Sequence, residues 1–287
     1  MSKILYGKPV AENLDIQSKD IFKDYASKHD KLPRLTAITV GDNAASLMYV
    51  SVKEKKAQEL GVEFNWIKLN EATSENELQE AIFENSSSSQ GMIIQLPLPK
   101  HLEIEKIIDL IPNDIDVDGL TSFNLGKLYS DNFNVIPATS FAILELLSHY
   151  QIDTEDKNIV IAGRSRLVTS PLSKILSSKQ YNANVTVIHS RTSNQKEFIS
   201  NADIFISGVG KSKLFDRSYF KENSYVIDVG ISVVDGKSYG DIDISDLDNY
   251  LSGRAPYPGG VGPITVSGLY SNLAKLISYF PIPQELF

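Results

Sequence analysis

The sequence predicts a two-domain α/β protein, and three observations support this fold class. The chain has 287 residues, which is long for a single hydrophobic core. Its apolar share of 42% and charged share of 22% are ordinary for a globular protein. Short β-rich runs alternate with segments of helical periodicity in both halves of the chain. We therefore expect a three-layer α/β domain and a doubly wound, Rossmann-type parallel-sheet domain, with the active site in the cleft between them.

The first half of the chain predicts one sheet and its covering helices. Gly61 is placed as the C-terminal stop of one helix, and Ser74 with Glu77 forms a capping box that opens the next. The last strand must end at Pro97 or Pro99, because proline cannot donate to a sheet ladder. The expected elements are a helix over 9–28, a strand over 34–40, a helix over 44–60, a strand over 62–69, a helix over 74–85 and a strand over 91–98.

The second half repeats the alternation more regularly. A helix over 139–150 follows the first half, and a Gly/Pro loop at 256–263 precedes a last helix over 264–279, which is expected to pack back on the first domain. We expect residues 1–139 plus 266–287 to form the catalytic domain and 140–265 the dinucleotide-binding domain. The expected strands of the dinucleotide-binding domain lie at 158–163, 184–190, 203–209 and 225–231.

Composition excludes several classes of function. The chain has no cysteine and only four scattered histidines, which argues against a disulfide, a thiolate nucleophile or a metal site. A net charge of −8 argues against broad nucleic-acid binding. No apolar run is long enough to span a bilayer, and the first residues lack the apolar core of a signal peptide. We therefore expect a cytoplasmic enzyme.

The strand at 158–163 is followed by a tight turn and a helical segment, the arrangement that binds pyrophosphate in doubly wound domains. The G-x-G-x-x-G fingerprint is incomplete, because its three glycine positions hold Gly163, Ser165 and Val168. A glycine that simply ends a strand is the competing interpretation.

The charge pattern after this turn favours NADP over NAD. NAD enzymes usually place an acidic residue about 20 positions after the glycine turn, where it binds the ribose hydroxyls. Here no Asp or Glu occurs between Gly163 and Glu197. Arg164, Ser190 and Arg191 could instead donate hydrogen bonds to a 2′-phosphate. Chance clustering of basic surface residues is the alternative.

Tyr49 and Lys53 are four residues apart, so they share one face of the helix expected over 44–60. In a partly closed cleft, a lysine can have a lowered pKa and exchange protons near neutral pH. The alternative is an exposed basic face formed by Lys53, Lys55 and Lys56.

Two further segments contain candidate polar groups. Asp116 and Asp118 lie in the acidic turn NDIDVDG, where a carboxylate could accept paired hydrogen bonds from an aminopyrimidine-type ring. Ordinary turn chemistry is the alternative for both aspartates. Gln95, in an expected buried strand, either has a satisfied amide or orients a catalytic side chain.

These motifs occur in a characteristic order. The chain resembles the bifunctional methylenetetrahydrofolate dehydrogenase/methenyltetrahydrofolate cyclohydrolase family along nearly its whole length. The resemblance rests on S-x-x-Y-V-x-x-K from Ser46 to Lys53, IIQLPLP, DIDVDG, GRSRLVTSPL with HSRT, VIDVGI and PGGVGPIT.

The resemblance implies NADP-dependent oxidation of 5,10-methylenetetrahydrofolate and hydrolysis of the methenyl product to 10-formyltetrahydrofolate. It implies that Lys53 is the acid/base lysine beside Tyr49, that Gln95 tunes it, and that Asp118 anchors the pterin ring. It also implies a homodimer. The remaining substrate-binding residues that it implies are Leu96, Pro258, Gly259 and Gly260. The implied cofactor-binding residues are Gly163, Arg164, Ser165, Val168, Ser190, Arg191, Gly208, Gly210, Gly230 and Ile231.

Four positions depart from the family pattern. Ile115 replaces a lysine, while Ser140 and Ser212 each replace a proline. Thr169 stands where the phosphate turn normally has a glycine, so its side chain is expected to crowd or hydrogen-bond the pyrophosphate. Three alternatives stay open: a shikimate-type dehydrogenase with another small substrate, a cofactor-binding module without turnover, and an enzyme that keeps only one of the two activities.

Overall fold

A computed structural model describes residues 2–279, which divide into two compact units. Of the described residues, 2–11 and 139–265 form the six-stranded unit, and 12–138 and 266–279 form the three-stranded unit. Residues 2–11 therefore group with the second half of the chain, whereas the sequence analysis placed them in the first domain. The reason is β1, a two-residue strand (Lys3–Ile4) that pairs in parallel with β11 (Gly253–Ala255). A strand this short has no alternation that sequence could reveal.

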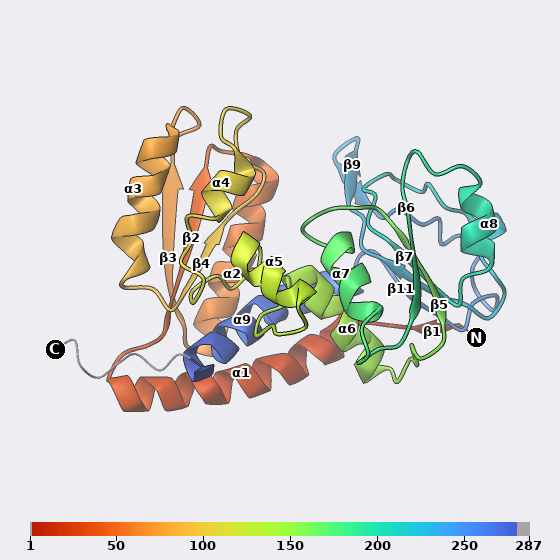
Figure 1. The fold of residues 1–287 in the computed structure, drawn as a ribbon, viewed down its shortest axis with the longest axis horizontal. Coiled ribbons are helices and arrows are strands. Elements are labelled where there is room, and N and C mark those ends of the chain that lie inside the picture. The colour runs from red at the N-terminus through yellow and green to blue at the C-terminus, as the bar shows by residue number, and fades with distance from the viewer. Residues whose placement is uncertain (1, 280–287) are drawn as a thin grey trace. The chain divides into compact units, whose positions relative to one another are not determined.

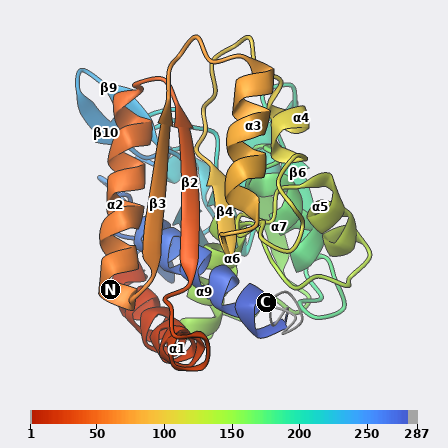
Figure 2. The ribbon, with the colours of Figure 1, turned by 90° about the vertical axis from the view of Figure 1, so that its left-hand side faces the viewer.

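The three-stranded unit is a parallel sheet between two helical layers (Figure 2). Its strands run in the order β3-β2-β4, and β2 pairs in parallel with both neighbours. The bounds are α1 Gly7–His29, β2 Arg34–Val40, α2 Ala44–Leu60, β3 Glu63–Leu69, α3 Glu75–Ser86, β4 Gly91–Ile94, α4 Ile104–Ile108, α5 Ser122–Tyr129 and α9 Val261–Tyr279.

Alternation along the strands separates the two cores of this unit. Leu35 and Ala37 of β2 point into one cluster, together with α2 and α9, while Ile38 and Val40 point into another with α3. The last helix contributes Leu269, Tyr270, Leu273, Ala274 and Leu276 to the first cluster. The last helix therefore packs in the core of the three-stranded unit.

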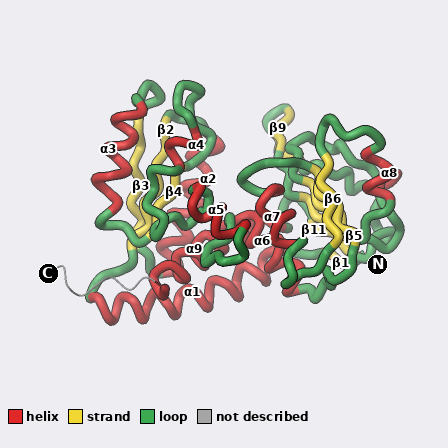
Figure 3. Tube along the Cα trace, viewed as in Figure 1, coloured by secondary structure: helices red, strands yellow, loops and turns green. Residues whose placement is uncertain are grey.

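The six-stranded unit contains a parallel sheet in the order β1-β11-β8-β7-β5-β6. Figure 1 shows α7 on one side of this sheet and α8 on the other. Figure 3 shows the strands of the sheet side by side, in yellow. Because β6 and β7 lie on opposite sides of β5, the direction of winding reverses there. The remaining bounds are α6 Ala138–His149, β5 Asn158–Ala162, α7 Thr169–Leu176, β6 Asn184–Ile188, α8 Gln195–Ser200, β7 Ile204–Ser207, β8 Tyr225–Asp228, β9 Ser232–Val234 and β10 Lys237–Tyr239.

Local signals set several element boundaries. Gly61 ends α2 in the left-handed conformation with φ of 76°, and Ser74 and Glu77 form the reciprocal capping box at α3. The Gly/Pro loop is shorter than expected, because α9 already begins at Val261. Within residues 2–279, no helix combines the length and the apolar character needed to cross a bilayer.

Candidate active site

Three of the predicted catalytic side chains lie together in the three-stranded unit. Lys53, on α2, donates a hydrogen bond from Nζ to Oε1 of Gln95 at 3.0 Å. Nε2 of Gln95 donates to the Leu96 carbonyl at 2.8 Å, which directs the amide oxygen toward the lysine. Asp118 is close enough to interact electrostatically with Lys53. The arrangement pairs an amine with a neutral acceptor and a carboxylate.

The start of α2 and the end of β4 place these groups. The Asn43 side chain caps α2 by accepting from the Ser46 N–H at 3.0 Å. Ser46 Oγ also donates to the Leu96 carbonyl at 3.3 Å, which ties the helix start to the segment after β4. Gln95 was expected within a strand, but it follows β4, which ends at Ile94. The Gln95 N–H still donates to the Ile38 carbonyl of β2, while the Gln95 side chain is directed toward Lys53.

Burial and mutual charge act in opposite directions on the two ionisable groups. Burial lowers the pKa of Lys53 below its ordinary value of 10.5, and the nearby Asp118 carboxylate partly offsets this effect. Burial raises the pKa of Asp118, which Lys53 opposes and Asp116 reinforces. Tyr49, one helical turn before Lys53, has 39% of its surface exposed. The structure therefore favours the active-site interpretation of Lys53 over a solvated basic face, while Lys55 on the same helix is exposed.

The two aspartates of DIDVDG have different environments. Asp116 is fully buried and accepts hydrogen bonds at 2.9 Å from the Thr121 N–H and from the Asn124 side chain. These contacts fix the turn that carries Asp118, which is only half-buried. The structure therefore supports the turn-chemistry interpretation for Asp116. Asp118 is the aspartate whose charge interacts with that of Lys53.

Sequence reasoning missed two residues of α9 that support this site. The buried Asn272 side chain donates to the carbonyls of Val117 and Ile136, at 2.9 and 2.8 Å, and so fixes the residue before Asp118. The Tyr270 hydroxyl donates to the carbonyl of Lys53 itself. The available signal was a polar residue within the apolar run of the last helix, since a buried amide requires partners.

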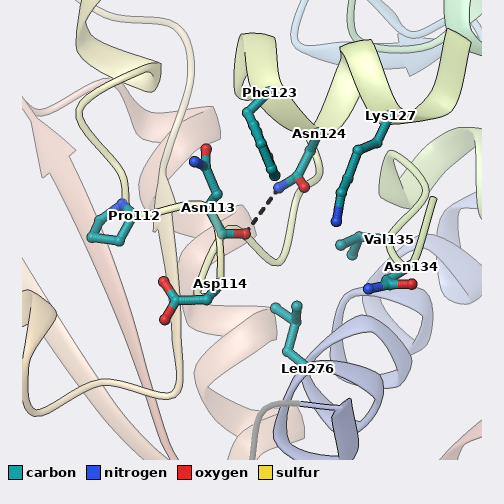
Figure 4. Close-up of a pocket in the computed structure, with 9 residues that line it drawn as sticks. All are labelled: Pro112, Asn113, Asp114, Phe123, Asn124, Lys127, Asn134, Val135 and Leu276. Atoms are coloured by element: carbon teal, nitrogen blue, oxygen red, sulfur yellow. Dashed lines mark hydrogen bonds between the residues drawn. The ribbon is translucent and has the colours of Figure 1, made fainter. Parts of the chain in front are cut away.

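A pocket of about 470 Å³ lies elsewhere in the same unit (Figure 4). Asn124 lines it and donates to the Asn113 carbonyl at 3.1 Å, the bond drawn in the figure. Neither Lys53, Gln95 nor Asp118 belongs to its wall, so we assign it no part in the chemistry. The other lining residues are Pro112, Asp114, Phe123, Lys127, Asn134, Val135 and Leu276.

The phosphate turn of the six-stranded unit begins directly after β5. Gly163 has a φ of 122°, a conformation that side-chain-bearing residues rarely adopt, and a Cβ there would lie 2.9 Å from the Gly208 carbonyl oxygen. Val168 is the N-cap residue of α7 and provides no side-chain cap. Ser165 Oγ accepts from the Leu167 N–H at 3.1 Å, which tightens the turn.

Thr169 does not take the place that the sequence suggested. It was expected to crowd or contact the pyrophosphate, but it is fully buried, and its Oγ1 accepts from the Ser165 N–H at 2.7 Å. Its methyl group packs against Gly163 and Gly208. Ser140 supports the same turn by donating to the Val168 carbonyl at 2.8 Å. Both departures from the family pattern thus stabilise the turn from inside.

Two further departures are less informative. Ile115 is 8% exposed and packs in the core of the three-stranded unit, where an apolar residue suits its surroundings. Nothing in the structure explains Ser212.

The residues expected to bind a 2′-phosphate lie at one edge of the sheet. Arg164 follows β5, and Ser190 and Arg191 follow β6, which is the neighbouring parallel strand. All three side chains are exposed at the carboxyl ends of these strands, where doubly wound sheets bind dinucleotides. The turn at Gly163 offers close backbone approach, and the two arginines offer positive charge. This edge therefore fits NADP.

The other predicted cofactor residues follow β7 and β8. Gly208 and Gly210 lie in the loop after β7, and Gly230 and Ile231 in the loop after β8. The segment Pro258–Gly260 belongs to the six-stranded unit, so it is not in the same unit as Lys53. There the Gly7 N–H donates to the Gly259 carbonyl at 2.8 Å. Among the residues that the structure describes, no group of three or more acidic or histidine side chains is placed to hold a metal ion.

Comparison with known proteins decides which family this site represents. Residues 5–118 match the catalytic domain of the tetrahydrofolate dehydrogenase/cyclohydrolase family, and residues 137–280 match its NAD(P)-binding domain. The chain belongs to this family. The sequence-based recognition of the family and of its two-domain α/β fold is confirmed.

Relatives within the tetrahydrofolate dehydrogenase/cyclohydrolase family cover almost the entire chain. Bifunctional protein FolD from Clostridium perfringens is 39% identical over 277 residues, which are 96% of this chain and 99% of the relative. The structure of the bifunctional FolD enzyme from Campylobacter jejuni is 33% identical with a TM-score of 0.91, covering 97% and 99% of the two chains. The Trypanosoma brucei FolD structure, complexed with NADP and an inhibitor, is 26% identical with a TM-score of 0.91, covering 97% and 98%. Membership of this family favours the predicted activity on folate substrates over the shikimate-type alternative.

Proposed function

We propose that Lys53 transfers the protons in a bifunctional, NADP-dependent methylenetetrahydrofolate dehydrogenase and methenyltetrahydrofolate cyclohydrolase. As a member of its family, the chain oxidises 5,10-methylenetetrahydrofolate to the 5,10-methenyl form and hydrolyses that product to 10-formyltetrahydrofolate. One observation carries the assignment to Lys53: its Nζ is held by Gln95 at 3.0 Å, and burial lowers its pKa.

The oxidation step depends mainly on holding the substrate in place. Bound NADP supplies the hydride acceptor for this step. The Asp118 carboxylate would anchor the pterin by accepting a pair of hydrogen bonds from its amino group and ring N–H. Asn272, which holds the carbonyl of Val117, limits the movement of that anchor. Tyr49 flanks the same site from the face of α2 that carries Lys53. Little proton transfer is needed, since the loss of hydride itself creates the cationic methenyl product.

Hydrolysis requires a group that accepts a proton and then returns it. Water adds its oxygen to the methenyl carbon and gives one proton to the neutral Lys53 amine. The resulting ammonium, oriented by Gln95, donates that proton to the ring nitrogen as the bond from this nitrogen to the carbon breaks. The hydroxyl proton leaves to solvent, and the formyl group remains on the other nitrogen. A lowered pKa keeps Lys53 neutral more often, which also avoids repelling the cationic substrate.

We also propose roles for the residues around the dinucleotide and at the pterin edge. Arg164, Ser190 and Arg191 are the candidates for contact with the 2′-phosphate, because they are exposed at the ends of the paired strands β5 and β6. Leu96 and the Pro258–Gly260 segment are the further candidates for contact with the folate. The backbone and small side chains proposed to border the rest of the cofactor are Gly163, Ser165, Val168, Gly208, Gly210, Gly230 and Ile231.

We further propose that the enzyme works as a cytoplasmic homodimer. The absence of cysteine and the family resemblance support this proposal. The β9–β10 hairpin also exposes apolar surface, since Val233 and Val234 are 69% and 45% exposed. Light scattering of the purified protein would test the oligomeric state, and a monomer at micromolar concentration would contradict the proposed homodimer.

The test of the lysine assignment is an absorbance assay with 5,10-methylenetetrahydrofolate and either NADP or NAD. Wild type should reduce NADP without accumulating the methenyl product. Lys53→Met should lose hydrolysis by about 10²- to 10⁴-fold, the usual contribution of a positioned acid/base group. It should still bind NADP. Lys55→Met, on the exposed face of the same helix, is the matched control and should behave as wild type. Unimpaired hydrolysis in Lys53→Met would remove Lys53 from the mechanism.

A further inference from the structure

Two buried aspartates of the six-stranded unit lie outside the set of residues assigned so far. Asp228 is the last residue of β8 and is 4% exposed, while Asp241 follows the β9–β10 hairpin and is fully buried. A buried carboxylate is costly unless its oxygens are hydrogen-bonded, so the hydrogen-bond partners of these two aspartates matter for the fold around them.

The Asp241 carboxylate holds the loop that follows β7. Oδ2 accepts from Ser207 Oγ at 2.6 Å and from the Val209 N–H at 2.7 Å, and Oδ1 accepts from the Lys211 N–H at 2.7 Å. Asp241 thus binds every second residue from 207 to 211. A short irregular segment with three anchors to one side chain has little freedom to move.

Asp228 in turn holds the backbone around Asp241. Its carboxylate accepts from the N–H groups of Gly230 at 3.1 Å, Asp241 at 3.0 Å and Ile242 at 3.0 Å. Glycine is required beside both acids, because a Cβ at Gly230 would overlap the Asp241 carboxylate and one at Gly240 would overlap that of Asp228. The two carboxylates are therefore built into the loops on either side of β8.

The loop held by Asp241 forms one wall of the phosphate turn. Gly208 lies against Gly163, since a Cβ on Gly163 would come within 2.9 Å of the Gly208 carbonyl oxygen. Thr169 packs its methyl group between the two glycines. The strands β5 and β7 that precede these loops lie where the winding of the sheet reverses, which is the position of dinucleotide sites in such sheets.

We propose that Asp241 is a positioning residue for the dinucleotide cofactor, acting through the loop 207–211, with Asp228 holding Asp241 in place. The proposal rests on the dinucleotide site described above. Because β7 and β6 flank β5 on opposite sides, this loop acts on the part of the cofactor beyond the pyrophosphate. Arg164, Ser190 and Arg191 serve the adenosine 2′-phosphate end on the other side.

The experiment is a direct binding titration of Asp241→Asn with NADPH and, separately, with 2′,5′-ADP, which lacks the nicotinamide half. The variant should bind NADPH at least about 10-fold more weakly, since two backbone donors and a hydroxyl lose their charged acceptor. Its affinity for 2′,5′-ADP should stay within about twofold of wild type. Hydrolysis of supplied methenyltetrahydrofolate, measured without dinucleotide, should be unchanged. Asp246→Asn, whose side chain is 71% exposed, is the matched control.

The outcomes separate this proposal from the proposed function. Failure of the wild type to bind NADPH would overturn the dinucleotide site itself. NADPH affinity within about twofold of wild type in a folded Asp241→Asn variant would overturn the role of Asp241, as would equal loss of NADPH and 2′,5′-ADP. Should this variant fail to fold, Ser207→Ala removes one anchor and leaves Asp241 in place. NADPH binding at wild-type strength in Ser207→Ala would then contradict the proposal. Weaker binding of NADPH with unchanged binding of 2′,5′-ADP would support it.

Discussion

Replacing Thr169 by valine isolates the hydroxyl that tightens the phosphate turn. Valine keeps the branched shape that packs against Gly163 and Gly208, and it removes the hydroxyl, which accepts from the Ser165 N–H at 2.7 Å and donates weakly to the Ser165 carbonyl at 3.5 Å. Thr169 is fully buried, so no water replaces the lost bond. Losing the acceptor of a buried donor costs about 1–3 kcal/mol of unfolding free energy. Most of this cost should fall on the six-stranded unit.

Urea unfolding followed by circular dichroism measures this loss. With a slope of about 2 kcal/mol per molar urea, the midpoint should fall by about 0.5–1.5 M. NADPH affinity should fall as well, because the turn that the hydroxyl holds is the proposed pyrophosphate site. Thr169→Ser is the control, since it keeps the hydroxyl and loses the methyl group. A Thr169→Val midpoint equal to that of wild type would refute the claim that this hydrogen bond shapes the turn.

Four further substitutions, at Gln95, Asp118 and Asp228, address the lysine and two of the carboxylates. Gln95→Leu removes the acceptor of Lys53 Nζ and should lower the hydrolytic kcat by about 10- to 100-fold. Gln95→Glu adds a negative charge beside Lys53, so it should raise the pKa of the lysine and cause a loss of hydrolytic kcat that becomes smaller at high pH. The dependence of kcat on pH checks both variants. Asp118→Asn removes the charge that raises the pKa of Lys53, so the rise of hydrolysis with pH should move to lower pH, and an unmoved profile would contradict the coupling. Burial raises the pKa of Asp228 from 3.8 to about 7, although hydrogen bonds from the backbone N–H groups of Asp241, Ile242 and Gly230 partly oppose this rise. Protonation of Asp228 therefore stabilises the fold fully below pH 3.8, and this stability, about 4 kcal/mol, is lost as pH rises through about 7. Asp228→Asn should flatten the pH dependence of thermal unfolding in that window, and an unchanged slope would contradict the assignment.

The sequence predicted those elements of the fold that carry a local signal. The β-rich run that forms β2, the glycine after α2 and the capping box at α3 each depend on neighbouring residues, and each was confirmed. The short strands β1 and β11 exist only because they pair with each other and with β8. Pairing between residues 3 and 253 is a long-range contact, so the grouping of residues 2–11 with the second half could not be predicted from local patterns.

Site prediction met the same limit. Lys53, Gln95 and Asp118 were identified from motifs, and the structure brings them together in one unit. The sequence did not predict which hydroxyls and amides support them. Thr169 was expected to crowd or hydrogen-bond the pyrophosphate, but its side chain is buried beneath the turn, because the direction of a side chain depends on the packing around it. Asp241 was missed because its three partners lie 30 or more positions away along the chain.

The most direct test of the central claim is the pKa of the Lys53 amine itself. Side-chain ¹⁵N NMR titration of the folded enzyme can measure it, with Lys53→Arg used to assign the signal and the exposed Lys55 as an internal reference. We predict that the pKa of Lys53 is clearly below both that of Lys55 and the ordinary value of 10.5, and that it is lower still in Asp118→Asn. A Lys53 pKa at or above 10.5 would mean that the amine stays protonated through the working pH range, and the proposed proton transfer would be wrong.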